Sequence, residues 1–349
     1  MTHTLNLNGL IPKLPLIQGG MGVGISLHQL AGHVAKEGGI GIISSAQVGY
    51  REEDFLTHTL EANKRALSNE IQKAKAIAPN GIIGVNIMVA LKHYKEMVET
   101  AIRAGADLII SGAGLPINLP QFAQGASNVK LVPIVSSGKA ATIICKMWDR
   151  KNQIAPDALV VEGPLAGGHL GFSLEDLKKN LNVLDLVQEV KEALKPFEAK
   201  YQRAIPVIAA GGIYTGEEVK LALESGCDGV QMATRFVTTY ECDAPLTYKQ
   251  TYIGAKREDI AIIKSPVGMP GRAICNRFIK SPPGNKACFY HCLEKCSITS
   301  IPYCISNALI SAARGQVDDA LLFCGANAYR SEALEHVSDI FTEIKTALG

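Results

Sequence analysis

Eight short apolar runs, separated by amphipathic stretches, constrain the fold of this chain more than any other feature of its sequence. The runs occupy residues 14–20, 40–46, 81–89, 107–114, 131–137, 158–163, 205–212 and 228–236. Nearly continuous apolar sequence of this length is typical of strands that are buried on both faces of a parallel sheet. Eight such strands, most of them followed by a helical pattern, predict an α/β fold of the (β/α)8 TIM-barrel type rather than an open doubly wound sheet.

Capping residues support the helices expected between these runs. The stretch SLHQLAGHVAKEGG begins at Ser26, whose hydroxyl is suited to an N-cap, and ends at Gly38 and Gly39. The sequence TGEE at 215–218 fits a capping box. We therefore expect one helix after the first strand and another after the seventh.

The regular alternation ends after the eighth run. Residues 240–300 are punctuated by proline and glycine, as in SPVGMPGRAICNRFIKSPPG, and they include a group of cysteines. We expect a barrel over residues 1–239, a small insertion or lid over 240–304, and closing C-terminal helices over 305–349.

Charge and hydropathy exclude several classes of partner. Lys and Arg total 35 against 33 Asp and Glu, and no long basic block is present, so we expect no nucleic-acid partner. The apolar runs are far shorter than the ~20 residues of a membrane span, so we expect no membrane partner either. The amino-terminal stretch lacks the pattern of a signal peptide, and we expect a cytoplasmic protein.

One histidine stands in the glycine-rich stretch VVEGPLAGGHLGF, residues 160–172. Taken alone, His169 fits a hydrogen-bonded histidine in a turn as well as a functional group. Glycines, however, cluster at the carboxyl ends of the predicted strands, and in a barrel this end carries the active site. The sequence therefore predicts that His169 lies in a loop on the catalytic face, just beyond the sixth strand.

Two glycine-rich loops point to a phosphate-bearing cofactor. Gly211 and Gly212 follow the seventh strand, and Thr234 follows the eighth, where many barrels bind phosphate. The stretch GGMGVG at 19–24 has Ile25 where a dinucleotide fingerprint needs glycine, so it does not fit that motif. The two remaining interpretations are a tight turn whose backbone contacts a flat ligand and a turn with a purely structural role. A cofactor with one phosphate and a planar head, such as FMN, fits both loops.

Six motifs carry a specific resemblance: PLIQGGMG, GVNIM, SGAG, VVEGPLAGGH, PVIAAGGI and GVQMATRF, in this order. Together they resemble the nitronate monooxygenase (2-nitropropane dioxygenase) family, which includes flavin-dependent enoyl-ACP reductases. The resemblance covers residues 15–236 nearly continuously, and CGANAYR at 324–330 is similar to the family's late flavin-contacting segment. It implies a TIM barrel over 1–239 that binds FMN non-covalently, with 305–349 completing the flavin site.

The resemblance also implies the cofactor contacts. Those to the isoalloxazine would come from Gly20, Met21 and Gly22. Those lining the flavin and its ribityl chain would be Asn86, Gly112, Glu162, Gly163 and Gly168. Those to the phosphate would be Gly211, Gly212, Ala233 and Thr234, with Asn327 arriving from the C-terminal segment. Ala233 departs from the family's usual glycine, and Pro164 and Leu165 replace more polar residues.

By the same resemblance, His169 matches the catalytic histidine, acting as a base beside a nitro group or as a donor to a carbonyl. The function implied is an FMN-dependent oxidoreductase that oxidises small nitronates or nitroalkanes with O2. The alternative is an NAD(P)H-dependent enoyl-thioester reductase, in which Arg272, Arg277 and Lys280 would meet a phosphate. A flavin-binding sensor without turnover is a third reading. A homodimer is expected by resemblance.

Four cysteines, Cys288, Cys292, Cys296 and Cys304, follow the spacing C-x3-C-x3-C-x7-C. Four thiolates in a reducing compartment suit an iron–sulfur cluster or a structural zinc, although the spacing is that of neither common motif. Buried thiols without a metal are the alternative. A metal cluster here would weaken an oxygen-consuming role.

Overall fold

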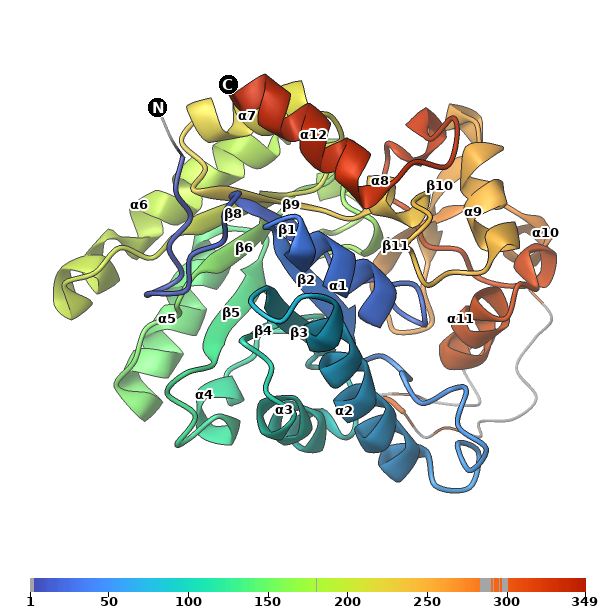
Figure 1. Cartoon of the computed structure of the whole chain (residues 1–349), viewed down its shortest axis with the longest axis horizontal. Coiled ribbons are helices and arrows are strands. Elements are labelled where there is room, and N and C mark those ends of the chain that lie inside the picture. Colours follow the sequence, from blue (N-terminus) through green and yellow to red (C-terminus); the bar gives the residue numbers. More distant parts are fainter. Residues whose placement is uncertain (1–2, 180, 283–289, 291, 295, 297–300) are drawn as a thin grey trace.

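The computed structural model describes residues 3–179, 181–282, 290, 292–294, 296 and 301–349. Eight parallel strands close into a barrel in the order β1-β2-β3-β4-β5-β6-β8-β9, with β9 pairing back to β1 (Figure 1). They are β1 (Leu16–Gln18), β2 (Ile40–Ser44), β3 (Ile82–Met88), β4 (Leu108–Gly112), β5 (Lys130–Val135), β6 (Leu159–Glu162), β8 (Val207–Ala210) and β9 (Gly229–Met232). Seven lie inside the predicted runs, β5 begins one residue before its run, and the TIM-barrel prediction is confirmed.

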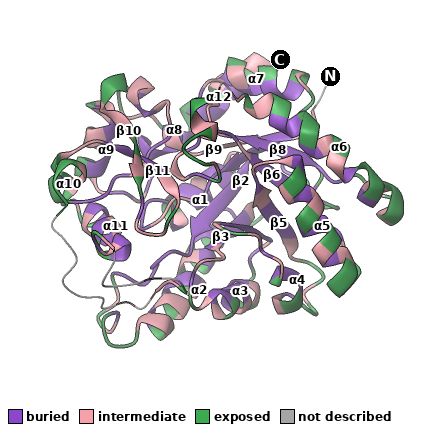
Figure 2. Ribbon diagram, turned by 180° about the vertical axis from the view of Figure 1, so that it is seen from behind, coloured by how far each residue is buried: buried purple, intermediate pink, exposed green. Residues whose placement is uncertain are grey.

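The strands are apolar along their whole length because each has two buried faces. Ile42 belongs to a cluster of strand residues that fills the barrel interior, whereas its neighbour Ile43 packs with the surrounding helices. Leu5 and Leu7, from the amino-terminal segment, join the interior cluster and close one end of the barrel. Figure 2 shows buried residues concentrated on the strands and on the inward faces of the helices.

Helices surround the barrel, and two of them are only four residues long. They are α1 (His28–Lys36), α2 (Thr59–Ile77), α3 (Tyr94–Arg103), α4 (Leu119–Phe122), α5 (Gly138–Asn152), α6 (Val183–Tyr201), α7 (Gly216–Glu224), α8 (Thr234–Val237) and α12 (Val337–Leu348). The capping box before α7 is confirmed, because Thr215 Oγ1 accepts from the Glu218 N–H and the Glu218 carboxylate accepts from the Thr215 N–H. The C-terminal helix α12 packs against α7 (Figure 1).

The described residues between 238 and 313, which follow α8, form an insertion beside the barrel (Figure 1, right). This insertion is called the excursion below. It contains α9 (Leu246–Ile253), β10 (Ile260–Lys264), β11 (Pro270–Ile274), α10 (Arg277–Lys280) and α11 (Ile305–Ala313). β10 and β11 form an antiparallel sheet that is completed by β7 (Gly168–His169), in the order β10-β11-β7. His169 therefore lies in a two-residue strand, where the sequence predicted a loop. The division at 239/240 and 304/305 stays a prediction.

Within the described residues, no helix is both long enough and apolar enough to span a membrane.

Candidate active site

The predicted cofactor residues gather at one end of the barrel. Gly20, Met21 and Gly22 follow β1, and Asn86 lies near the end of β3. Gly112, Glu162, Gly163, Gly211, Gly212, Ala233 and Thr234 lie at or just beyond the ends of β4, β6, β8 and β9. Because the strands are parallel, their carboxyl ends share one mouth of the barrel, and in such barrels this mouth carries the active site. The structure thus brings these residues to one face.

His169 is held at this mouth by the excursion. Its backbone pairs with Gly271 of β11, and the next residue, Leu170, donates its N–H to the Pro270 carbonyl over 2.8 Å. Its Nε2 lies 2.7 Å from Ser265 Oγ, and its ring meets the edge of Phe323 with the ring centroids 4.9 Å apart. Burial lowers the pKa of His169 to about 4, so the imidazole is neutral at pH 7.

Glu162 and Arg272 place two ionisable groups in the same region. Burial raises the pKa of Glu162 to about 7, although the Gly171 N–H and the charge of Arg272 both act to lower it. Arg272 lies on β11 opposite Gly168, is only 8% exposed, and donates through Nη1 to the Ala166 carbonyl. Burial also lowers the pKa of Arg272. A buried positive charge therefore lies close to a carboxyl that titrates near neutral pH.

The predicted phosphate loops have the geometry that close backbone approach requires. Gly211 and Gly212 have φ of +101° and +89°, a region that side chains other than glycine rarely adopt. Thr234 Oγ1 accepts from the Gly325 N–H over 3.1 Å, which leaves its own hydrogen free to be donated to a phosphate oxygen. Asn327 arrives as predicted, and its Nδ2 donates to the Gly212 carbonyl over 2.8 Å.

The turn after β1 is fixed tightly against its neighbours. A Cβ at Gly22 would lie 2.6 Å from Ser44 Oγ, and a Cβ at Gly20 would collide with Asn86. A Cβ at Gly19 would lie 3.2 Å from the Cβ of Ala233, so the alanine that departs from the family pattern packs directly against this turn. Glycine at these positions lets the turn pack closely against its neighbours.

Two observations test whether FMN fits these residues. Gln231 Oε1 is buried without a hydrogen-bond partner among the described residues, and its side chain lies against Gly19. Gly168 faces open space, with no atom within 4 Å of where its Cβ would be. An orphaned amide beside the glycine turn and an open glycine beside His169 are both compatible with a bound planar cofactor. The residues present fit FMN.

Several residues of this site are not indicated by any sequence pattern. Gln231 lies inside a quoted motif but was not singled out, whereas Ser265 and Phe323 carry no local signal. Their proximity to His169 depends on long-range pairing of β7 with β11. Gly112 and Gly163 have packing reasons to be glycine, because a Cβ there would lie 3.0 Å from Ile134 and 2.7 Å from Val183.

Of the cysteine segment, the described residues 292–294 lie against residues 90–92, which follow β3. The Cys292 carbonyl accepts from the Lys92 N–H over 3.0 Å, and Cys292 Sγ lies 3.0 Å from Ser306 Oγ. Cys288 lies outside the described residues. Among those that the structure does describe, no three or more His, Cys, Asp or Glu side chains are placed to hold a metal ion. A metal on Cys288, Cys292, Cys296 and Cys304 stays a prediction.

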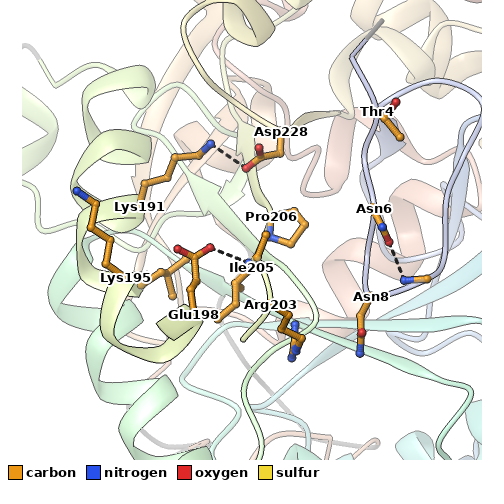
Figure 3. A pocket seen from close by; sticks show the side chains of 13 residues that line it. Thr4, Asn6, Asn8, Lys191, Lys195, Glu198, Arg203, Ile205, Pro206 and Asp228 are labelled. Carbon is orange, nitrogen blue, oxygen red and sulfur yellow. Dashed lines mark hydrogen bonds and ion pairs between the residues drawn. The ribbon is translucent and has the colours of Figure 1, made fainter. Parts of the chain in front are cut away.

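A cleft of about 520 Å³ lies at the opposite, amino end of the barrel strands (Figure 3). Pro206 precedes β8 and Asp228 precedes β9, so the cleft is remote from the strand ends that carry His169. Two of its charged groups are paired within the cleft: Lys191 meets Asp228 at 2.9 Å, and Glu198 accepts from the Ile205 N–H over 2.8 Å. In TIM barrels the amino end of the strands usually contributes to stability, whereas the active site lies at the carboxyl end.

Solved structures share the fold of this chain. FabK from Thermotoga maritima superposes with a TM-score of 0.71 at 23% identity, covering 97% of this chain and 93% of that one. Nitroalkane oxidase from Streptomyces ansochromogenes superposes with a TM-score of 0.70 at 20% identity, covering 96% and 97%. At these identities, the similarity shows the fold.

Curated relatives are similar at the level of sequence. A probable nitronate monooxygenase of Staphylococcus aureus (strain Newman) is 27% identical over 305 residues, covering 77% of each chain. The (3aS,4S,5R,7aS)-5-hydroxy-7a-methyl-1-oxo-octahydro-1H-indene-4-carboxyl-CoA dehydrogenase of Rhodococcus jostii (strain RHA1) is 28% identical over 267 residues. That match covers 76% of this chain and 64% of the dehydrogenase.

The profile of one family, described as nitronate monooxygenase, matches residues 5–346, nearly the whole chain. The match includes the barrel, the β7–β11 pairing that holds His169, and the segment that brings Asn327 to Gly212. The resemblance found in the sequence is confirmed, and the chain belongs to the nitronate monooxygenase family of FMN-dependent oxidoreductases.

Proposed function

We propose that this protein binds FMN at the carboxyl end of its barrel and oxidises a small nitronate with O2. The observation that carries the proposal is the state of His169: a half-buried, neutral imidazole held by Ser265 beside the open glycine Gly168. Bound FMN would supply the redox chemistry, taking electrons from the organic substrate and passing them to O2.

The cofactor contacts of the proposal follow the geometry of the mouth. The positive-φ glycines Gly211 and Gly212, together with Thr234, would hold the phosphate. The turn at Gly20–Gly22 and the amide of Gln231 would meet the flavin head. Each group is a backbone N–H, a hydroxyl or an amide, which suits a phosphate and a polar heterocycle.

A nitronate suits His169 better than the parent nitroalkane does. A base whose pKa is about 4 removes a proton from a weak carbon acid inefficiently. A nitronate has already lost that proton, so the imidazole needs only to donate a hydrogen bond to the nitronate oxygen. The buried charge of Arg272, on the strand that pairs with β7, favours an anionic substrate in this region.

One observation favours the alternative, an NAD(P)H-dependent enoyl-thioester reductase. Leu165 is 48% exposed and lies against Gly212, which places an apolar side chain at the mouth where an acyl chain would rest. Two of the three basic residues that this alternative would use for a phosphate do not add support. Arg272 is buried, and Arg277 is engaged in an ion pair with Asp319.

Steady-state assays separate the two functions. The proposal predicts oxygen consumption with propyl-2-nitronate, and little NADH or NADPH oxidation when crotonyl-thioester is added. Nicotinamide oxidation that depends on the enoyl-thioester, without a response to the nitronate, would replace the proposal by the reductase. Failure of every substrate and reductant would favour the sensor reading.

The partners of the proposal are a small-molecule substrate and, in the alternative, NAD(P)H. A homodimer also belongs to the proposal, by resemblance to the family alone. Sedimentation equilibrium tests it, with twice the 37.3 kDa chain mass as the expected result.

A further inference from the structure

The excursion contributes one polar side chain directly to His169. Ser265 Oγ lies 2.7 Å from His169 Nε2, and this contact joins residues 96 positions apart in the sequence. Ser265 is 2% exposed, so water does not compete for its hydroxyl. A short contact in a water-excluded site fixes its partner more firmly than the same contact at the surface.

Ser265 is itself held in a tight turn between β10 and β11. Its N–H donates to the Met269 carbonyl over 3.1 Å, and its carbonyl accepts from the Gly268 N–H over 3.1 Å. β11, which closes this turn, also pairs with His169 through Gly271. The serine and the histidine are therefore positioned by the same three-stranded sheet.

The contacts of the hydroxyl indicate which way its hydrogen points. Ser265 Oγ accepts from the Val267 N–H at 3.5 Å, a long contact that uses one of its lone pairs. The acceptor that the structure places against the hydroxyl, among the described residues, is His169 Nε2. A serine hydroxyl has one hydrogen to donate, and a neutral imidazole has one nitrogen that can accept it. When Nε2 accepts, the ring proton resides on Nδ1.

We propose that Ser265 is a positioning residue that donates its hydroxyl hydrogen to Nε2 of His169 and thereby holds the imidazole as the Nδ1–H tautomer. This inference rests on the proposed function only in taking His169 as the group that meets substrate. In this tautomer Nδ1–H can donate a hydrogen bond to an anionic oxygen. Nε2 is occupied by the Ser265 hydroxyl and does not act as a base. The tautomer itself is a property of the protein and is measured without turnover.

Phe323 restricts the ring from another side. Its edge-on contact with His169 has a centroid separation of 4.9 Å, and its carbonyl accepts a hydrogen bond from the Tyr252 hydroxyl. The imidazole is thus fixed by one polar and one apolar partner, and rotation of the ring would break both contacts. The loss of Ser265 alone therefore leaves the ring in place and frees the choice of tautomer.

The test is a long-range ¹H–¹⁵N spectrum of the flavin-loaded protein labelled with ¹⁵N-histidine. The His169 signals are assigned by their absence from His169→Gln. At pH 7, the wild type is expected to show a protonated Nδ1 and an unprotonated Nε2, which differ widely in ¹⁵N chemical shift. Ser265→Ala is expected to show intermediate shifts from both tautomers, and Ser265→Thr, which keeps a hydroxyl, to show the wild-type pattern.

Ser136→Ala is the matched control, because the Ser136 hydroxyl donates to the Gly171 carbonyl of the same loop without touching His169. It should keep the wild-type tautomer. In turnover, Ser265→Ala should lower kcat by up to about tenfold while changing KM less, because part of the Nδ1–H donation to the anionic oxygen is lost while the ring is retained.

A wild-type spectrum with the proton on Nε2 would overturn the inference, whatever the variants do. Unchanged His169 shifts in Ser265→Ala would also overturn it. If the nitronate is not oxidised but the Nδ1–H tautomer is found and depends on Ser265, the proposed function fails and the positioning role stands.

Discussion

At the scale of single residues, Glu162 and His169 are opposite cases of the same physical effect. Burial disfavours the charged form of each, so the pKa of the carboxyl rises to about 7 and that of the imidazole falls to about 4. Both groups are therefore largely uncharged at pH 6. The mouth of the barrel thus holds a carboxylic acid and a neutral imidazole whose pKa values differ from those in water. Such pairs of displaced pKa values are typical of functional sites.

Glu162 predicts a specific dependence of stability on pH. An unfolded glutamate loses its proton near pH 4.5, whereas the folded one keeps it to about pH 7. The folded state binds more protons in this window, so its stability falls as pH rises, by up to about 3 kcal/mol at 1.36 kcal/mol per pKa unit. In urea unfolding, the free energy of unfolding of Glu162→Gln should rise relative to that of the wild type between pH 4.5 and 8. A difference between the two proteins that stays constant across this range would contradict the raised pKa.

Gly211 gives a second residue-scale prediction. Its φ is +101°, and a Cβ there would lie 2.8 Å from the Ala166 N atom. Gly211→Ala should weaken flavin binding at least about tenfold, because the loop must shift to relieve both the strain and the collision. Gly105→Ala is the matched control: φ is +87° but nothing lies within 4 Å, so it bears backbone strain alone. Flavin titration followed by fluorescence measures both, and equal affinities in the two variants would contradict the phosphate assignment.

At the scale of elements, local sequence predicted the strands and the α7 capping box well, and the start of α1 badly. Ser26 was expected to cap α1, but its hydroxyl accepts from the Met21 N–H, and α1 begins at His28. The cap comes from the excursion: Asp243 accepts from the N–H groups of Leu27 and Leu30 at 2.7 and 3.2 Å. A carboxylate 213 positions away cannot be found by a local pattern.

Asp243 therefore predicts a stability effect outside the active site. Asp243→Ala leaves the buried N–H groups of Leu27 and Leu30 without their acceptor, which should cost about 2 kcal/mol in the free energy of unfolding. Asp319→Ala, which breaks an exposed ion pair with Arg277, should cost clearly less, because solvent screens exposed ion pairs. Urea unfolding of both variants at pH 7 makes the comparison. Equal losses would contradict the capping role.

At the scale of the whole molecule, the barrel could be predicted because its apolar runs are local and repeat eight times. That the candidate cofactor residues gather at one mouth could be predicted because the ends of parallel strands meet there, whereas their contacts to FMN stay a prediction. The surroundings of His169 could not be predicted, since Ser265 and Phe323 reach it only through the pairing of β7 with β11. The two-residue strand at His169 likewise depends on its distant partner rather than on its own glycine-rich sequence.

The cysteine segment carries the remaining whole-molecule prediction. If Cys292, Cys296 and Cys304 act with Cys288 as ligands, protein purified without oxygen should contain about one zinc or one iron–sulfur cluster per chain. Cys304→Ser should then lose the metal but keep the flavin. Elemental analysis and visible absorbance measure both, and metal-free protein with a full complement of flavin would leave these residues as thiols.

The most direct test of the central claim is anaerobic mixing of the flavin-loaded protein with propyl-2-nitronate, followed by flavin absorbance. The account predicts rapid loss of oxidised-flavin absorbance in the wild type and a rate about tenfold lower in His169→Gln, since the positioned hydrogen bond to an anionic substrate is lost and such a bond contributes about 1.5–3 kcal/mol. Reduction by NADH or NADPH with no response to the nitronate, or equal rates in wild type and His169→Gln, would contradict it.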